Sequence, residues 1–408
     1  MPSSPAPASG RASASTAPTP TAFLAFVESP VQLLNVLEWA HTPEHPAPST
    51  GPAPSSEAAP SSEAAPSTEP SPSPEHPPTR QPPPSPGRVA AARDLTLVVL
   101  SPTDPMSRGQ LRRMAQLARD EGVTVRWQEA RGGRGALLRT LRELTPLLRH
   151  AQRVIIGDPF SRYVQLLLTL YAPENVTVVD DGTATMEFAA QLTRGERLVR
   201  WHRRAGLSPR ELALAPVTSL ARRRLAPGRR RTLEIFTALP VEAPPGTTVT
   251  PHRFHWTRAR FGPPRLTRGA DLVGTSLVET GVVDPDRYAE AVGALAAAHG
   301  ATRYFAHRRE GVEKLHRIAV ETGLEIVRPD LPLELIARRG PIGRTVLSFP
   351  STVVHTLPQA LAGTGITITV CAIAPEWLRE DVPPRARGFL AGVAESARRA
   401  HGLSLTGV

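Results

Sequence analysis

Two adjacent carboxylates followed by a glycine are the first feature of this sequence that could do chemistry. Asp180-Asp181-Gly182 follows the apolar run 176–179, and only one of two neighbouring side chains on a strand can face a site. A carboxylate that is desolvated near a second negative charge has a raised pKa and can act as a general base. An Asx turn that caps a following helix is the alternative interpretation. Because the pair lacks the intervening residue of an Asp-x-Asp clamp, we expect no obligatory metal.

A histidine beside two arginines is the second feature. His307-Arg308-Arg309 follows the run 302–306. An imidazole next to two fixed cations would bind a phosphate, and a protonated His307 could donate a proton to it. A surface histidine among solvated arginines is the alternative.

Hydroxyl side chains follow a third run, 345–347. Ser348, Ser351 and Thr352 could direct hydroxyls, together with the backbone amides of a following helix, at an anion. A helix N-cap needs only one of them, so simple capping is the alternative.

Weaker signals come from three other places. Gly274-Thr275-Ser276 follows the short run 271–273, which makes Gly274 and Ser276 candidates for the same kind of anion contact. Glu334, at the start of a helix or strand, could bond ribose hydroxyls or cap that element. Glu28 and Ser29 end the first apolar run, 21–27.

The elements that would position these residues alternate between strands and helices. Short apolar runs separated by amphipathic segments indicate a parallel sheet that is covered on both faces. In the first half the expected elements are 21–27, 31–39, 95–100, 110–119, 124–128, 136–148, 153–156, 163–171 and 176–179. In the second half they are 271–273, 288–299, 302–306, 312–322, 325–327, 333–337, 345–349, 357–362 and 367–372.

This pattern predicts an α/β protein with two Rossmann-like halves that face a cleft. Ligands of open parallel sheets bind beyond the carboxyl ends of the strands, where the polar clusters lie. We expect a disordered N-terminus at 1–20, an N-terminal domain at 21–265, a C-terminal domain at 266–375, and a C-terminal helix and tail at 376–408.

A proline-rich segment interrupts the first half. Residues 41–87 hold sixteen prolines and a near-repeat, PSSEAAPSSEAAPST, and cannot bury enough apolar surface to fold. We therefore interpret 41–88 as a disordered, low-complexity insertion that the N-terminal domain continues across, since long surface insertions cost little closure entropy.

Charge is distributed unevenly along the chain. The net charge is +11, and residues 197–231 hold eleven arginines against one acid, Glu211, which leaves +10 in that segment. A solvated basic face or loop is the simplest interpretation. A surface for anionic lipid, an acidic glycan or nucleic acid is the alternative.

Composition excludes several classes. No apolar run approaches the roughly 18 residues of a membrane span, and the first twenty residues lack the apolar core of a signal peptide. Cys371 is the only cysteine, so an intramolecular disulfide and a cysteine-based zinc cluster are excluded. We expect a cytoplasmic protein, with association at the inner face of the membrane through Arg197–Arg231 left open.

The order of these motifs carries a resemblance. Carboxylates in the first half, then histidine with arginine, then a Ser/Thr cluster, together with FLAFVESPVQLLN at 23–35, resemble the bacterial polysialyltransferase and lipooligosaccharide sialyltransferase group. The resemblance spans most of residues 21–375 outside the insertion. It implies a GT-B glycosyltransferase that transfers sialic acid from CMP-sialic acid with inversion and without a metal or other cofactor.

The resemblance also implies roles for individual residues. The acidic-acidic-Gly motif would supply the general base, with Asp181 preferred and Asp180 second. The family's His-Pro motif, which contacts the CMP phosphate, falls on His307, and Arg308 stands where the family has proline.

The remaining candidates divide between the two substrates. Donor contacts would come from the second half: Arg308, Ser348, Ser351, Thr352, Gly274, Ser276 and Glu334. The acceptor side would hold Glu28, Ser29, Gln32 and Gly182. The expected partners are a nucleotide sugar and a glycan acceptor such as a cell-surface polysaccharide, and nucleic acid is not expected.

Two alternatives remain. The same fold could use another nucleotide sugar, because the preference for cytidine comes from the resemblance alone. The chain could instead be a non-catalytic protein that binds anions, nucleic acid or lipid through its arginine-rich segment.

Overall fold

The structure is a computed structural model that describes residues 22–42, 92, 94–131, 133, 135–198, 200, 209–380, 382 and 384–406. The expected disordered N-terminus at 1–20 and residues 43–88 of the expected insertion lie outside these ranges. So do residues 199 and 201–208 of the arginine-rich segment.

The described strands form two parallel sheets. The first sheet has the order β3-β2-β1-β4-β5-β6-β7, and the second has the order β10-β9-β8-β11-β12-β13. The first consists of β1 (Phe23–Val27), β2 (Leu95–Leu100), β3 (Thr124–Gln128), β4 (Arg153–Ile156), β5 (Asn175–Val179), β6 (Thr232–Thr237) and β7 (Thr248–Pro251). The second consists of β8 (Leu266–Val273), β9 (Ala301–Phe305), β10 (Glu325–Val327), β11 (Ile342–Ser348), β12 (Thr367–Cys371) and β13 (Ser404–Thr406).

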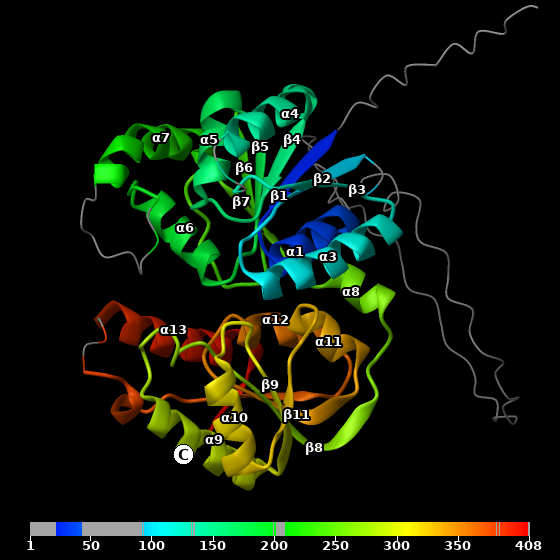
Figure 1. The fold of residues 1–408 in the computed structure, drawn as a ribbon, viewed down its shortest axis with the longest axis vertical. Coiled ribbons are helices and arrows are strands. Elements are labelled where there is room, and N and C mark those ends of the chain that lie inside the picture. The colour runs from blue at the N-terminus through cyan, green and yellow to red at the C-terminus, as the bar shows by residue number, and fades with distance from the viewer. Residues whose placement is uncertain are drawn as a thin grey trace, which may run out of the picture.

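Every ladder pairs its strands in parallel, and the strand order reverses at the first strand of each sheet, which is the Rossmann arrangement. The predicted α/β fold with two Rossmann-like halves, an architecture of the GT-B type, is therefore confirmed. The halves lie one above the other (Figure 1).

Helices cover both faces of each sheet. In the first half they are α1 (Pro30–His41), α3 (Pro105–Asp120), α4 (Ala136–His150), α5 (Arg162–Tyr171), α6 (Thr183–Thr193) and α7 (Pro209–Leu225). In the second they are α9 (Pro285–His299), α10 (Val312–Thr322), α11 (Leu333–Arg339), α12 (Val353–Ala360), a 3-10 turn (Pro375–Trp377) and α13 (Pro384–His401). Within the described residues, no helix is long and apolar enough to cross a membrane.

The alternation of side chains along the central strands explains why two helix layers form. In β1, Ala25 and Val27 pack into the core beneath α1 and α3, whereas Leu24 and Phe26 pack into the core beneath α4 and α5. Because successive side chains on a strand point to opposite faces, a continuous apolar strand needs cover on both sides.

The two halves are joined by α8 (His255–Arg260) and share a core at their boundary. Leu331, which precedes α11, and Leu335 within α11 belong to the same buried cluster as Leu33 and Leu37 of α1. The Gln110 side-chain amide also donates to the Pro329 carbonyl at 2.7 Å. The helices of the two halves are therefore in direct contact on this side of the molecule.

Several elements differ from the expectations. Strands β6 and β7 and helices α6, α7 and α8 were not predicted. Part of the arginine-rich segment forms α7, which packs along α5, where the Thr169 hydroxyl donates to the Val217 carbonyl at 3.4 Å.

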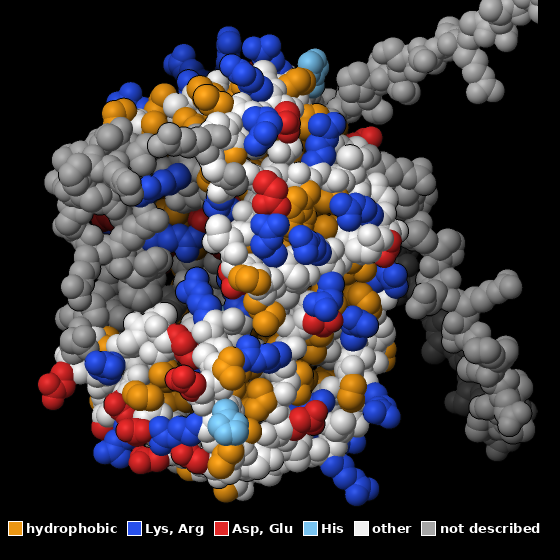
Figure 2. Space-filling model, viewed as in Figure 1, with side chains coloured by type: hydrophobic (Ala, Val, Ile, Leu, Met, Phe, Trp, Pro, Cys, Tyr) orange, Lys and Arg blue, Asp and Glu red, His pale blue; other side chains and the backbone are white. Residues whose placement is uncertain are grey.

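Charged side chains are distributed unevenly over the surface. Basic side chains prevail on the half that holds α3 to α7, and acidic ones gather at the lower left of the other half (Figure 2).

Candidate functional site

The Asp180-Asp181-Gly182 motif lies where β5 ends and α6 begins, and its two carboxylates have different surroundings. Gly182 is the N-cap of α6, with φ of +67° and no side-chain cap bond. Neither aspartate therefore caps α6, so the alternative interpretation of this motif as an Asx turn that caps the helix is wrong. The positive φ explains the glycine, which adopts this conformation without strain.

Asp180 points into the interior of the first half. It is 3% exposed, and both carboxylate oxygens have donors: the Thr237 hydroxyl at 2.5 Å and the Ala238 N–H at 2.7 Å. Its backbone carbonyl accepts from the Asn35 amide at 2.8 Å. Burial raises the pKa of Asp180 to about 6. These contacts tie β5 to β6 and leave the carboxylate little capacity for a ligand.

The Asp181 side chain contacts Arg200 and Gln32 of the first half, and the charge of Arg308 acts on it from the second half. Burial, followed by the negative charge of Asp158, raises the pKa of Asp181 to about 7. The Gln32 side chain and the cations Arg200 and Arg308 act in the opposite direction. A carboxylate with a pKa near neutrality can take a proton at physiological pH, so of the two aspartates Asp181 has the properties of a general base.

Asp158 and Arg200 border Asp181 and were not among the predicted site residues. One guanidinium nitrogen of Arg200, Nη2, lies 2.5 Å from Asp158 Oδ2 and 3.5 Å from Asp181 Oδ2. Asp158 follows β4, so the rule that located the other strand-end clusters could have found it. No sequence signal separates Arg200 from the ten other arginines of its segment.

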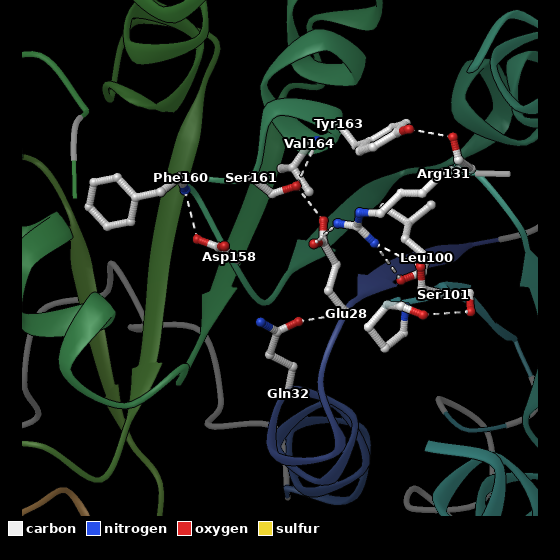
Figure 3. A network of polar contacts seen from close by, with 12 residues as sticks. Glu28, Gln32, Leu100, Ser101, Arg131, Asp158, Phe160, Ser161, Tyr163 and Val164 are labelled. Atoms are coloured by element: carbon white, nitrogen blue, oxygen red, sulfur yellow. Dashed lines mark hydrogen bonds and ion pairs between the residues drawn. The ribbon is translucent and has the colours of Figure 1, made fainter. Parts of the chain in front are cut away.

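The end of β1 holds the predicted acceptor-side residues in a polar network (Figure 3). Glu28 accepts from the Arg131 guanidinium and the Ser161 hydroxyl. Burial raises the pKa of Glu28. Ser29 is the N-cap of α1, and its hydroxyl accepts from the Gln32 N–H at 3.2 Å.

Gln32 connects this network to the Asp181 side. Its side-chain oxygen, Oε1, accepts from the Glu28 backbone N–H at 2.7 Å, and the same side chain also bonds to Asp181. Gly157 lies directly against Gln32, and a Cβ at Gly157 would overlap the Gln32 side chain. Gly157 is therefore needed for close packing, a requirement that the sequence did not reveal.

His307 follows β9 in the second half. Its Nδ1 accepts from the Arg309 N–H at 3.2 Å, so the neutral ring carries its proton on Nε2. Burial lowers the pKa of His307 to about 4, with smaller effects in the same direction from Arg308, Arg309 and Lys314. In the unliganded chain His307 is thus a neutral hydrogen-bond donor rather than the cation considered above.

Arg308 carries positive charge from the second half toward the first. Its charge lowers the pKa values of both Asp181 and Asp104, and Asp104 is the N-cap of α3. An arginine at this position therefore places a cation at the boundary that holds the candidate base.

The loop of His307 is fixed by a buried network beneath it. Glu310 accepts from the His307 N–H at 2.5 Å and from the Tyr304 hydroxyl at 2.6 Å, and Lys314 Nζ lies 2.7 Å from it. A Cβ at Gly274 would overlap both Glu310 and Tyr304. Gly274 therefore contributes space for this network, and its N–H bonds to the Phe305 carbonyl.

The hydroxyl cluster after β11 is split. Ser348 is 1% exposed and donates to the Phe349 carbonyl at 3.1 Å, whereas Ser351 and Thr352 are half-buried. Thr352 is the N-cap of α12 and its side chain makes no capping bond. A Cβ at Gly182 would lie 3.3 Å from Thr352 Oγ1, so this hydroxyl touches the turn after Asp181.

Two further donor-side candidates have internal partners. Glu334, in the first turn of α11, is 5% exposed and accepts from the Thr356 hydroxyl at 2.6 Å. Its negative charge raises the pKa of Asp180 slightly, which places Glu334 near the domain boundary. Ser276 is half-buried, and its carbonyl accepts from the Thr280 N–H at 3.0 Å.

The structure thus brings Asp181, Gly182, Arg308 and Thr352 together from both halves, with Gln32, Asp158 and Arg200 around them. Asp180, Ser348, Gly274 and Glu334 are engaged in internal contacts. In the described part of the chain, no group of three or more His, Cys, Asp or Glu side chains is arranged to hold a metal ion.

Comparisons with known proteins give distant similarities only. No family model and no curated protein matches the sequence. Among solved structures, the chain is similar to an α/β-galactoside α-2,3-sialyltransferase from the luminous marine bacterium Photobacterium phosphoreum, with a TM-score of 0.48 and 9% identity over 94% of this chain and 98% of the other. It is also similar to a sialyltransferase from Photobacterium damsela, with a TM-score of 0.42 and 9% identity over 95% of this chain and 81% of the other.

A third similarity is to the protein Os79 from O. sativa in complex with UDP, with a TM-score of 0.31 and 12% identity over 77% of this chain and 90% of the other. All three similarities are too distant to bear on the reaction of this chain.

Proposed function

We propose that this protein is a glycosyltransferase of the GT-B type that transfers sialic acid, or a related acidic sugar, from a CMP-activated donor to a glycan acceptor. The donor would bind to the second half and the acceptor to the first. The transfer would invert the anomeric carbon and would need no metal.

Asp181 is the proposed base. An acceptor hydroxyl attacks the anomeric carbon, the bond from that carbon to the CMP phosphate breaks, and Asp181 takes the hydroxyl proton. A pKa of about 7 leaves the carboxylate substantially ionised at neutral pH and still basic enough to accept the proton.

His307 and Arg308 are the proposed contacts of the leaving phosphate. The neutral His307 ring carries a proton on Nε2, and Arg308 adds a positive charge. As negative charge develops on the departing phosphate, the hydrogen bond from His307 Nε2–H to a phosphate oxygen strengthens, and the proton stays on the ring. Since CMP leaves with a single phosphate, protein donors can take the place of the magnesium that diphosphate donors often use.

The observation that carries this proposal is the meeting of the two halves at Asp181. The candidate base ends a strand of the first sheet, and the Thr352 hydroxyl and the Arg308 charge reach the same place from the second sheet. A displacement reaction needs a base and an anion-stabilising group on opposite sides of the reacting carbon, and the residue types that meet at this boundary support the assignment of these two roles.

A calorimetric titration with CMP, UMP, GMP and AMP in the presence of EDTA tests the donor class. We expect selective binding of CMP. Selective binding of another nucleotide would point to a different sugar donor, and the absence of any nucleotide binding would contradict the proposal as a whole.

Transfer from CMP-sialic acid to a panel of glycans then tests the base. We expect Asp181→Asn to bind CMP with unchanged affinity and to lose turnover by about 100-fold or more, which is typical for loss of a general base. Arg223→Gln serves as a control for the arginine-rich segment, because Arg223 is exposed on α7 and its replacement removes one positive charge from that segment. If Arg223→Gln lost activity and Asp181→Asn kept it, the basic segment and not this site would carry the function.

A further inference from the structure

The Arg200 guanidinium lies in a cradle built by the loop that follows β4. Asp158 Oδ1 accepts from the Phe160 N–H at 2.8 Å, and its second oxygen holds Arg200 at 2.5 Å (Figure 3 shows the Asp158 and Phe160 contact). The Arg200 guanidinium carbon lies 5.8 Å from the centroid of the Phe160 ring, a cation–π distance. Carboxylate, backbone and aromatic ring together fix this arginine.

The same guanidinium reaches Asp181. The nitrogen that binds Asp158 is 3.5 Å from Asp181 Oδ2, so a single Nη2 lies between the two carboxylates. Asp158 is 8% exposed, and this placement inside the protein reduces screening of the three charges by water. The negative charge of Asp158 and the positive charge of Arg200 therefore act on Asp181 in opposite directions.

We propose that Asp158 and Arg200 are positioning residues that together orient the Asp181 carboxylate and set the pH at which it becomes a base. This inference rests on the proposed role of Asp181. Neither residue needs to touch the substrate, since both act through Asp181.

The other groups that face Asp181 come from different elements. Gln32 of α1 bonds to its side chain, and Arg308 after β9 adds a second positive charge from the other half. Thr185 in the first turn of α6 accepts from the Asp181 N–H at 2.9 Å and fixes its backbone. Among the groups around Asp181, Asp158 is the negative charge with the strongest influence on it, so Asp158 and Arg200 form a matched pair of opposite perturbations.

The test uses these opposite signs. In Asp158→Asn the amide oxygen can still accept from the Phe160 N–H, but the negative charge is gone, so Asp181 should ionise more readily. In Arg200→Gln the positive charge is gone, so Asp181 should ionise less readily. We expect the acid limb of kcat/KM to move to lower pH in the first variant and to higher pH in the second, each by about one pH unit.

Two further variants separate charge from structure. Arg200→Lys keeps the charge but loses the planar fork, so its acid limb should stay near that of the unaltered protein while kcat falls. Arg223→Gln, from the same segment but exposed, should leave the acid limb unchanged.

A second readout does not depend on turnover. Labelling aspartate with 13C at the side-chain carboxyl, and assigning the Asp181 signal by its absence in Asp181→Asn, gives the titration of this group by NMR. Opposite shifts of the Asp181 midpoint in Asp158→Asn and Arg200→Gln support the inference. Shifts in the same direction, or no shift in either variant, overturn it.

The two readouts distinguish the possible failures. If no protein, including the unaltered one, transfers sugar from a CMP donor, the proposed function is wrong. The NMR midpoints still decide whether Asp158 and Arg200 control the ionisation of Asp181.

Discussion

Replacing Asp180 separates its structural contacts from the chemistry of its neighbour. Asp180→Ala removes the acceptor of two donors, the Thr237 hydroxyl at 2.5 Å and the Ala238 N–H at 2.7 Å. Asp180→Asn keeps both contacts, because its amide oxygen can accept from Ala238 while its NH2 group donates to the Thr237 oxygen. Both variants remove the carboxylate charge, so the effect of that charge cancels when they are compared.

The difference between the variants follows from one orphaned donor. A buried donor without a partner costs about 1–3 kcal/mol, and only the Ala238 N–H loses its acceptor in Asp180→Ala while keeping it in Asp180→Asn, so the free energy of unfolding of Asp180→Ala should be lower by about 1–3 kcal/mol. The measurement is chemical denaturation followed by circular dichroism at fixed pH, with turnover measured on the same preparations. We expect Asp180→Asn to fold stably and to retain most of its turnover.

The pH dependence of the free energy of unfolding gives an independent check on the buried Asp180 carboxyl. The pKa of Asp180 is about 6 in the folded chain and near 3.9 when unfolded, so the folded state binds the proton more tightly between these values. Tighter proton binding by Asp180 in the folded chain adds about 3 kcal/mol to the free energy of unfolding below about pH 4, and this contribution is lost as the pH rises through about 6. In Asp180→Asn this contribution to the slope should be absent.

Two results would refute this reasoning. Equal stability of Asp180→Ala and Asp180→Asn would show that the Ala238 N–H does not depend on an Asp180 oxygen. A well-folded Asp180→Asn that loses turnover as completely as Asp181→Asn would place Asp180 in the chemistry and not in the scaffold.

Other predictions concern the second half and the turn at the boundary. Gly274→Ala should lower the free energy of unfolding by about 1–3 kcal/mol in denaturant titrations, because its Cβ overlaps Glu310 and Tyr304; Gly311→Ala, whose Cβ meets nothing within 4 Å, is the matched control. His307→Ala should reduce kcat by about 100-fold in steady-state assays, since a donor to the leaving phosphate is lost; an unchanged kcat would remove His307 from the mechanism. Gly182→Ala should destabilise the fold by about 1–3 kcal/mol, measured by denaturation, because φ of +67° with ψ of −136° is a conformation that residues other than glycine rarely adopt, and an unaltered midpoint would contradict that strain.

The alternation of strands and helices was readable from the sequence because buried parallel strands are continuously apolar. Leu95–Leu100 and Arg153–Ile156 have the predicted bounds. The strand Thr232–Thr237 was not predicted, because Glu234 interrupts the run of the buried apolar residues Leu233, Ile235 and Phe236. Helix α12 begins at Val353, four residues before the predicted start at Leu357, and this earlier start makes Thr352 an N-cap.

The candidate site was predicted in part. Position at a strand end located Asp181, His307 and Thr352, since carboxyl ends of parallel strands share one edge of a sheet. The same rule applies to Asp158 and could have found it. The division of labour between Asp180 and Asp181 depends on which side of the strand faces Thr237, and the location of Arg200 depends on tertiary packing, so neither is encoded in local spacing.

The way α8 is held has a consequence for dissection of the chain. In the described residues, the chain crosses from the first sheet to the second once, through α8. The Trp256 and Thr257 N–H groups of α8 donate to the Glu38 carboxylate of α1 at 3.0 and 2.8 Å. After this crossing, α13 and β13 stay with the second sheet. Cleavage just after α8 would therefore yield two fragments, each with an intact sheet, and their reassociation would measure how strongly the α1 and α11 surfaces hold the halves together.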